Sequence, residues 1–145
     1  MTPNLIVGVL LGHLVGDYVF QNNWMALAKN RNTFRCVVHC LIYTLAVCVL
    51  TSWHPAWVAV VFLSHFPVDR WTLADKWLRL IRGRSIKTFM ENGHEDIPLN
   101  EGPVRENYRI VRGGFTSLVY AGADNTFHLL IMFGGWMLLS RWFAL

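Results

Sequence analysis

The side chains best suited to chemistry in this 145-residue sequence are histidines and aspartates spaced four residues apart inside apolar stretches. Two stretches carry the pattern His-x-x-x-Asp, a third carries the reverse order, and a fourth holds one histidine: His13/Asp17, His65/Asp69, Asp124/His128 and His39. Because a helix rises about 1.5 Å per residue, residues four apart share one face, about 6 Å from each other. Ionisable groups are costly in hydrocarbon and commonly mark a functional site. The pattern therefore predicts a metal site inside a membrane.

Imidazoles and carboxylates are good ligands for zinc, and for iron, manganese or cobalt with less selectivity. The set offers four imidazoles and three carboxylates: His13, His39, His65, His128, Asp17, Asp69 and Asp124. Seven groups exceed what one tetrahedral zinc ion binds, so either two ions or outer carboxylates that orient the ligands would account for them. Asp124 is also the candidate catalytic base, because a carboxylate beside a metal-bound water could accept its proton.

Three polar residues near these motifs are candidate substrate-binding groups. Gln21 continues the face of His13 and Asp17 by one turn and could orient a ligand or bind substrate. Lys29 and Arg70 lie near the predicted inner face of the membrane, where they could hold a headgroup phosphate. Topology signals and plain headgroup contacts explain these two cations equally well.

The apolar stretches lie at about 4–20, 36–53, 56–70 and 118–143, and each is close to the length that spans a bilayer as a helix. Residues 71–82 have the amphipathic pattern of a helix at the membrane surface, and 83–115 read as a polar loop. The sequence thus predicts an all-α fold. We expect an integral membrane four-helix bundle with an interfacial amphipathic helix and a cytoplasmic loop, in a single domain over residues 1–145.

The depth of the seven groups tests the metal hypothesis. Counting the helix rise from the ends of the stretches places all of them between mid-membrane and the inner interface, whereas chance would scatter them over both leaflets. A single buried histidine is more often a hydrogen-bonded core residue, and His–Asp pairs could simply hold the helices together. The shared depth favours metal binding, and a proton or ion pathway is the main alternative. Cys36 and Cys40 lie near His39, and we expect them to be core residues rather than ligands.

Composition agrees with a membrane protein. Hydrophobic residues make up 54% of the chain, and the net charge is +4, with lysine and arginine gathered between the apolar stretches. That placement follows the positive-inside rule and does not indicate a nucleic-acid partner. The loops rich in lysine and arginine should be cytoplasmic, which puts both termini outside. The partners we expect are membrane lipid and a second copy of the chain, associated through tryptophan-rich faces.

The segment GHLVGDYVFQNNWMALAKN, from Gly12 to Asn30, resembles an uncharacterised family of small bacterial and phage membrane proteins, known only as a domain of unknown function. The likeness continues through His39, through His65 to Asp69, and through Asp124 to His128. More distantly, the His/Asp set is similar to that of bacterial inner-membrane proteins labelled as membrane-bound metal-dependent hydrolases. The resemblance implies the multi-pass fold, a bacterial inner membrane and a metal, but no reaction.

We therefore expect a membrane-embedded metal-dependent hydrolase that acts on a lipid or lipid-linked substrate near the cytoplasmic face. Its metal, zinc before iron or manganese, would lower the pKa of a bound water and polarise a phosphoryl or acyl oxygen. Two other classes stay open. A proton or divalent-metal transporter or channel component would depend on Asp17, Asp69 and Asp124 for flux. A structural or partner-binding membrane protein, phage-encoded or not, would tolerate amides in place of its histidines and aspartates.

Overall fold

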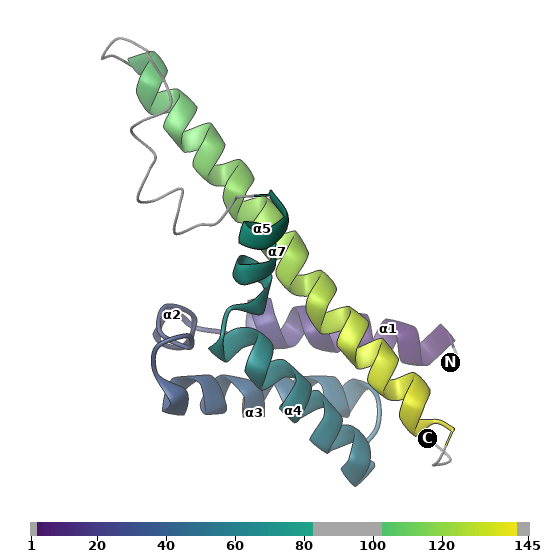
Figure 1. Ribbon diagram of the computed structural model, residues 1–145. Coiled ribbons are helices and arrows are strands. Elements are labelled where there is room, and N and C mark those ends of the chain that lie inside the picture. The colour runs from purple at the N-terminus through teal and green to yellow at the C-terminus, as the bar shows by residue number, and fades with distance from the viewer. Residues whose placement is uncertain (1–2, 83–102, 142–145) are drawn as a thin grey trace. The chain divides into compact units, whose positions relative to one another are not determined.

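A computed structural model describes residues 3–82 and 103–141, and its regular structure is helical throughout (Figure 1). Within these ranges there is no strand, so the predicted all-α class is confirmed. The elements, in chain order, are α1 (Pro3–Leu14), the π-helix η1 (Val15–Val19), α2 (Asn23–Ala26), α3 (Thr33–Leu50), α4 (Pro55–Arg70), α5 (Leu73–Arg82) and α7 (Pro103–Leu139).

The helices belong to two compact units. The first joins Met1–Thr72 to Phe127–Leu145, and therefore holds α1, η1, α2, α3, α4 and the last part of α7. The second, Leu73–Thr126, holds α5 and the first part of α7. All the predicted ligands except Asp124 fall in the first unit.

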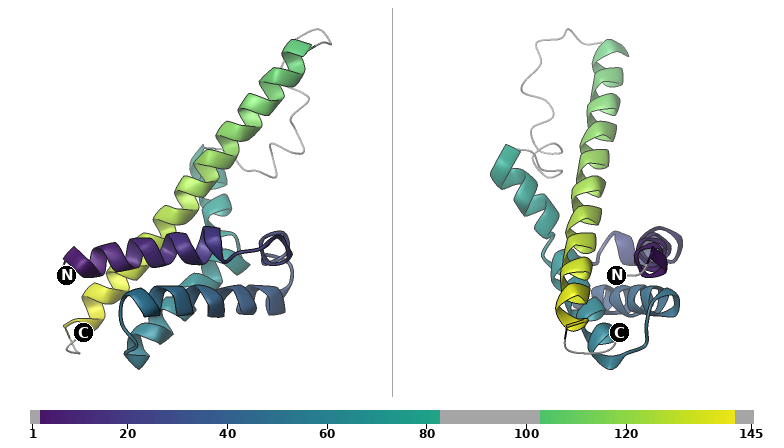
Figure 2. Two further views of the ribbon diagram at one scale, coloured as in Figure 1. Left: turned by 180° about the vertical axis from the view of Figure 1, so that it is seen from behind. Right: turned by 90° about the vertical axis from the view of Figure 1, so that its right-hand side faces the viewer.

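Helices α1 and α3 pack closely side by side in the first unit, as two opposite views show (Figures 1 and 2). Glycines at intervals of four make this possible. A Cβ atom on Gly8 would overlap the carbonyl oxygen of Leu50, and one on Gly12 would lie 2.7 Å from the Cα of Val47. Small residues at this spacing let two helix backbones approach each other closely. The glycines therefore set the distance between the helix that carries His13 and the helix that carries His39.

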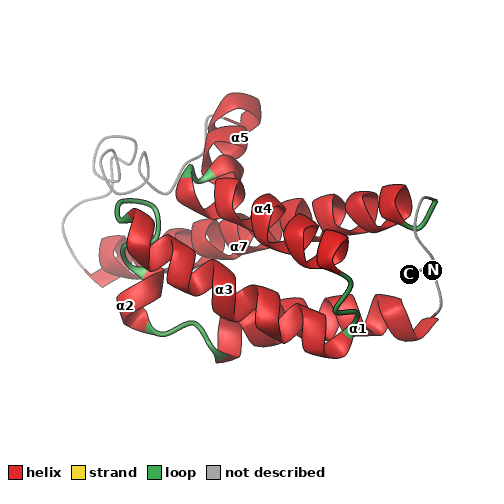
Figure 3. Cartoon of the chain, turned by 90° about the horizontal axis from the view of Figure 1, so that it is seen from below, coloured by secondary structure: helices red, strands yellow, loops and turns green. Residues whose placement is uncertain are grey.

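A short connection joins α3 to α4 and reverses the chain (Figure 3). The ring of His54 accepts a hydrogen bond from the backbone N–H of Ala56 at 3.3 Å and caps α4. Pro55 follows in the first turn, where its missing N–H leaves no bond unmade. The indole of Trp57 donates to the hydroxyl of Thr51 at 2.9 Å. The reversal thus lies at the His54–Pro55 pair.

The apolar core of the first unit joins α1, α3, α4 and the end of α7. Trp57 and Trp136 meet edge to face with ring centroids 4.9 Å apart, a favoured aromatic geometry. The other fully or nearly buried members are Val9, Tyr43, Val47, Cys48, Val61 and Met132. This core fixes α3 and α4 beside the segment of α7 that carries His128.

The structure differs from the sequence prediction at the start of α7. The helix begins at Pro103, so residues 103–115 of the predicted polar loop 83–115 are helical. A proline suits the first turn of a helix, and glycines such as Gly114 cost only about 1 kcal/mol each relative to alanine, which a long helix tolerates. Residues 83–102 of the predicted loop lie outside the described residues.

One helix in the described part of the chain, α3, is long and apolar enough to cross a membrane. Residues Asn4–Val19 form a shorter apolar helix. The predicted surface helix 71–82 is present as α5, and its side chains Trp77 and Ile81 are exposed. The arrangement of four spans, and the location of α5 at a membrane surface, remain predictions.

Thr72, between α4 and α5, is the position where we expect a substitution to stabilise the protein. Its φ is 47°, in the left-handed region that is unfavourable for a β-branched residue. Thr72→Gly should therefore raise the free energy of unfolding by about 1 kcal/mol. Thermal unfolding in detergent would measure this, with Thr72→Val as the matched control, which keeps the branched side chain and the strain. A melting temperature unchanged in the glycine variant would contradict the prediction.

Candidate metal centre

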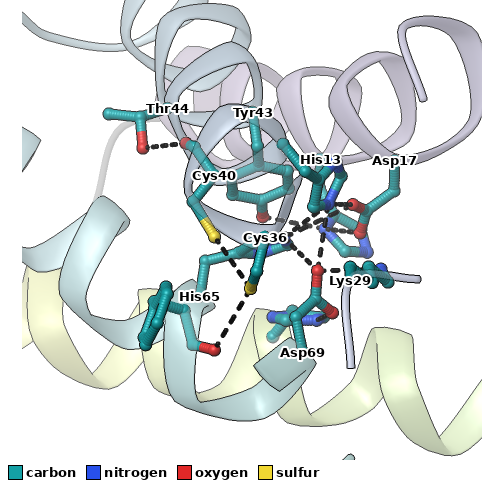
Figure 4. Close-up of polar contacts among 12 residues, drawn as sticks. His13, Asp17, Lys29, Cys36, Cys40, Tyr43, Thr44, His65 and Asp69 are labelled. Atoms are coloured by element: carbon teal, nitrogen blue, oxygen red, sulfur yellow. Dashed lines mark hydrogen bonds and ion pairs between the residues drawn. The ribbon is translucent and has the colours of Figure 1, made fainter. Parts of the chain in front are cut away.

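Buried histidine and aspartate side chains from separate helices converge inside the first unit (Figure 4). α1 and η1 bring the first motif, α3 the single histidine, α4 the second motif and α7 the last histidine. The side chains are His13, Asp17, His39, His65, Asp69 and His128. The structure thus brings together six of the seven predicted ligands, and their burial among apolar residues means that each must find a polar partner or an ion.

Two triads within this cluster could hold a metal ion. In the first, Asp17 Oδ1 lies 3.1 Å from His39 Nε2 and 3.5 Å from His65 Nε2, and the two nitrogens are 3.0 Å apart. Zinc bonds of about 2.0–2.1 Å in tetrahedral geometry place neighbouring ligand atoms roughly 3.3 Å apart. The three atoms therefore form a nearly equilateral triangle of the size that one face of a zinc site requires.

The second triad consists of His65, Asp69 and His128. Asp69 Oδ2 lies 3.2 Å from His65 Nε2, and Asp69 Oδ1 lies 3.4 Å from His128 Nε2. His65 is common to both triads. Its Nε2 has a single lone pair, so it can bind only one ion at a time. The two triads are therefore alternatives for His65 rather than two complete sites.

The electrostatics of the cluster favour a cation. Lys29 Nζ lies 2.8 Å from Asp69 Oδ2, and this ammonium group compensates one of the two buried carboxylates. With neutral imidazoles, the cluster keeps one uncompensated negative charge, which is costly in a buried site. Asp17 Oδ1 is buried and faces the ring nitrogens of His39 and His65. A metal ion facing Asp17 would satisfy both the charge and this oxygen.

The first motif is shaped by the π-helix. The N–H of Phe20 donates to the carbonyl of Val15 at 3.0 Å, a bond that spans five residues and widens the turn around Asp17. Gly16 in this turn faces the ring of Tyr43, which a Cβ would approach to 2.7 Å. Such π-turns often occur at functional sites. Because the π-turn interrupts the α-helical period, the four-residue spacing from His13 does not by itself fix where the Asp17 side chain points.

The predicted substrate-binding residues Gln21, Lys29 and Arg70 lie around the cluster, and each contacts other parts of the protein. Since the helix ends at Val19, Gln21 does not continue the face of Asp17 as expected. With its amide oriented to satisfy both groups, Gln21 donates to the Asp17 backbone carbonyl and accepts from Lys29 Nζ, each at 3.3 Å. Arg70 donates to the backbone carbonyl of Asn30 and, at 3.3 Å, to the hydroxyl of Thr33. Arg70 therefore tethers the segment that carries Lys29. A role in binding substrate stays a prediction for all three residues.

Two of the predicted metal ligands, Asp124 and His13, belong to neither triad. Asp124 lies on α7 in the second unit, so its roles as ligand and base remain predictions. His13 belongs to neither triad. Its Nδ1 lies 2.8 Å from the hydroxyl of Tyr43 and 3.4 Å from Asp17 Oδ2.

Sequence reasoning missed Tyr43, which lines the cluster from α3. Its ring stacks on that of His65 with centroids 3.6 Å apart, and its hydroxyl donates to Met132 Sδ at 3.3 Å. The available signal is its place four residues after His39, on the same helical face. The cysteines Cys36 and Cys40 are buried free thiols, 4.0 Å apart, and belong to neither triad.

Comparison with known proteins identifies one family. The family model described as "Protein of unknown function (DUF3307)" matches residues 5–89, which is more than half of the chain. The match includes both His-x-x-x-Asp motifs, His39 and Lys29, and ends before α7. No curated protein and no solved structure matches the chain.

Proposed function

This chain belongs to the DUF3307 family, whose function is unknown, and we propose that it is a membrane-embedded metal-dependent hydrolase acting on a lipid or lipid-linked substrate. The single observation that carries the proposal is the triangle of donor atoms from Asp17, His39 and His65. Three protein ligands and one open position are the usual arrangement of a catalytic zinc site, whereas structural sites are closed by four.

We assign one ion to the first triad. Both carboxylates face histidines of the cluster, but Asp69 Oδ2 also has Lys29 Nζ at 2.8 Å. The carboxylate without a cation is therefore the better ligand. Zinc fits the mixed nitrogen and oxygen set, and iron or manganese would accept the same ligands. When bound, such an ion lowers the pKa of water and polarises a phosphoryl or acyl oxygen. Asp69 and Lys29 would lie beside the open position and orient a polar substrate group.

The outward faces of the first unit support a membrane setting. Large apolar side chains are exposed on each of its long helices, among them Val7, Leu11, Leu14, Leu41, Leu45, Val49, Leu63, Leu130 and Leu138. The interior, by contrast, holds histidines and an aspartate. In water this distribution would be unfavourable, since soluble proteins rarely expose large apolar patches. In lipid it is the expected one, and it supports a membrane setting. We propose a multi-pass inner-membrane protein with both termini outside.

The substrate class follows from the surroundings of Asp17. Tyr18, Val19 and Phe20, which follow it directly, are all exposed. Lys29 has 17% of its side chain exposed, so a cation lies at the edge of the cluster. An apolar surface beside a cation suits an amphiphile whose anionic or ester headgroup reaches the metal while its chains stay in lipid.

A second candidate function is supported by the continuity of the polar contacts. Side chains from His13 through Asp17, His39, His65 and Asp69 to His128 follow one another at 3.0 to 3.4 Å. Such chains of aspartate and histidine also serve as proton or ion pathways in membranes. A proton or divalent-metal transporter would use the same residues without turnover of lipid.

The test uses full-length protein purified in detergent. Elemental analysis should find one zinc per chain, and hydrolysis of phosphate and carboxylic esters, including lipids, should require it. Removal of the metal with a chelator should reduce hydrolysis at least about tenfold, and added zinc should restore it. His54→Ala, which removes a histidine outside the cluster, serves as control. Metal-free protein that zinc does not load would refute the proposal, and ion flux in liposomes without hydrolysis would favour the transporter.

A further inference from the structure

The carboxylate of Asp17 has two different environments. Its Oδ1 faces the nitrogens of His39 and His65, where the proposed ion would bind. Its Oδ2 instead lies 3.4 Å from His13 Nδ1. A carboxylate that binds a metal through one oxygen commonly accepts a hydrogen bond at the other, which fixes its orientation.

The contacts of His13 determine which of its nitrogens carries hydrogen. A carboxylate only accepts hydrogen bonds, so Asp17 requires a donor at His13 Nδ1. The hydroxyl of Tyr43 lies 2.8 Å from the same nitrogen and 3.3 Å from Met132 Sδ, so it can donate to the sulfur and accept from His13. The Nδ1–H tautomer therefore satisfies both neighbours. In that tautomer Nδ1 cannot bind a metal, and His13 belongs to neither triad.

The two His-x-x-x-Asp motifs are not equivalent, although their spacing is the same. In the second, His65 faces Asp69 with Nε2, the nitrogen that belongs to both triads. In the first, His13 faces Asp17 with Nδ1 and lies outside both triads. The π-helix η1 occurs in the first motif, whereas α4 carries the second within an α-helix.

We propose that His13 is a positioning residue rather than a metal ligand: it holds the Asp17 carboxylate against the ion, and Tyr43 holds His13. This inference rests on the proposed metal site and assigns its outer hydrogen bonds. Outer partners of this kind typically contribute 10- to 100-fold to metal affinity without changing the ligand set. The first motif would then supply one ligand and its support, whereas His65 of the second is itself a ligand.

Cobalt substitution separates a positioning residue from a ligand, because the visible spectrum of Co²⁺ depends on the atoms bound to it. Full-length wild type, His13→Ala, His13→Asn and Tyr43→Phe would be titrated with Co²⁺ in detergent. We expect His13→Ala to bind Co²⁺ about 10- to 100-fold more weakly, yet to reach one ion per chain with the wild-type spectrum. His13→Asn should recover most of the affinity, because its amide N–H can replace Nδ1–H. Tyr43→Phe should lose less than His13→Ala.

Each other outcome contradicts one part of this proposal. A changed spectrum or a lost equivalent of Co²⁺ in His13→Ala would make His13 a ligand. Unchanged affinity in His13→Ala would remove its role altogether. If His13→Ala does not fold, as judged by circular dichroism, His13→Asn and Tyr43→Phe take its place. Co²⁺ spectra like that of the wild type in these two variants support the proposal, and altered Co²⁺ spectra refute it. A wild type that binds no Co²⁺ refutes the proposed function, and this inference with it.

Discussion

Replacing His65 with alanine should abolish stoichiometric metal binding. His65 belongs to both triads, and its Nε2 lies 3.0 Å from His39 Nε2 and 3.2 Å from Asp69 Oδ2. Neither triad is complete without it. We expect the loss of affinity to exceed the 10- to 100-fold that removal of an outer residue costs. Elemental analysis and Co²⁺ titration of the purified full-length variant would measure the loss, and hydrolysis should disappear with it.

Two variants that each disrupt only one triad show which of the two triads binds the ion. His39→Ala disrupts only the first triad and should behave like His65→Ala. His128→Ala disrupts only the second and should retain one ion per chain. The reverse result would move the site to His65, Asp69 and His128. Full metal content in His65→Ala would exclude both triads.

A methyl group added at Gly12 should destabilise the fold and weaken metal binding together. Its Cβ would lie 2.7 Å from the backbone Cα of Val47, and since a Cβ has no freedom to rotate away from its own helix, α1 and α3 would have to separate. Such overpacking typically costs 1–3 kcal/mol, which outweighs the gain in helix propensity of up to about 1 kcal/mol. The separation would also move Asp17 away from His39. We expect a lower melting temperature and a higher dissociation constant for Co²⁺.

Gly134→Ala is the matched control for Gly12→Ala. Gly134 is helical and lies in the same unit, but a Cβ there would meet nothing within 4 Å. Alanine at this position should stabilise the helix slightly through its higher propensity. Equal melting temperatures for the two variants would show that α1 and α3 do not require the glycine contact.

The spacing of histidine and aspartate was enough to predict the cluster. A four-residue interval fixes two side chains on one helical face, and counting the helix rise placed His39 at the level of His65. The structure brings these residues within hydrogen-bond distance. Which residues bind directly and which support them could not be predicted, because that depends on ring orientation and on the π-helix, and neither leaves a periodic signal.

Features that depend on contacts between helices were also missed. The sequence placed Lys29 near a headgroup, but its ammonium group contacts Asp69, which is far away along the chain. Gly8, Gly12 and Gly16 repeat at intervals of four, which is typical of a close helix contact, but the repeat alone does not identify the helix they meet. The start of α7 was not predicted, because the polar composition of residues 103–115 is as typical of a loop as of a solvated helix.

The ion pair between Lys29 and Asp69 has a consequence for how fast metal exchanges. Asp17 and Lys29 keep 9% and 17% of their side chains exposed, whereas His39, His65 and Asp69 are almost completely covered. An ion that enters beside Lys29 passes a positive charge on its way to Asp17, while the pair between Lys29 and Asp69 stays in place. Like charges repel, so loading and release of an ion at Asp17, His39 and His65 should be slow compared with diffusion.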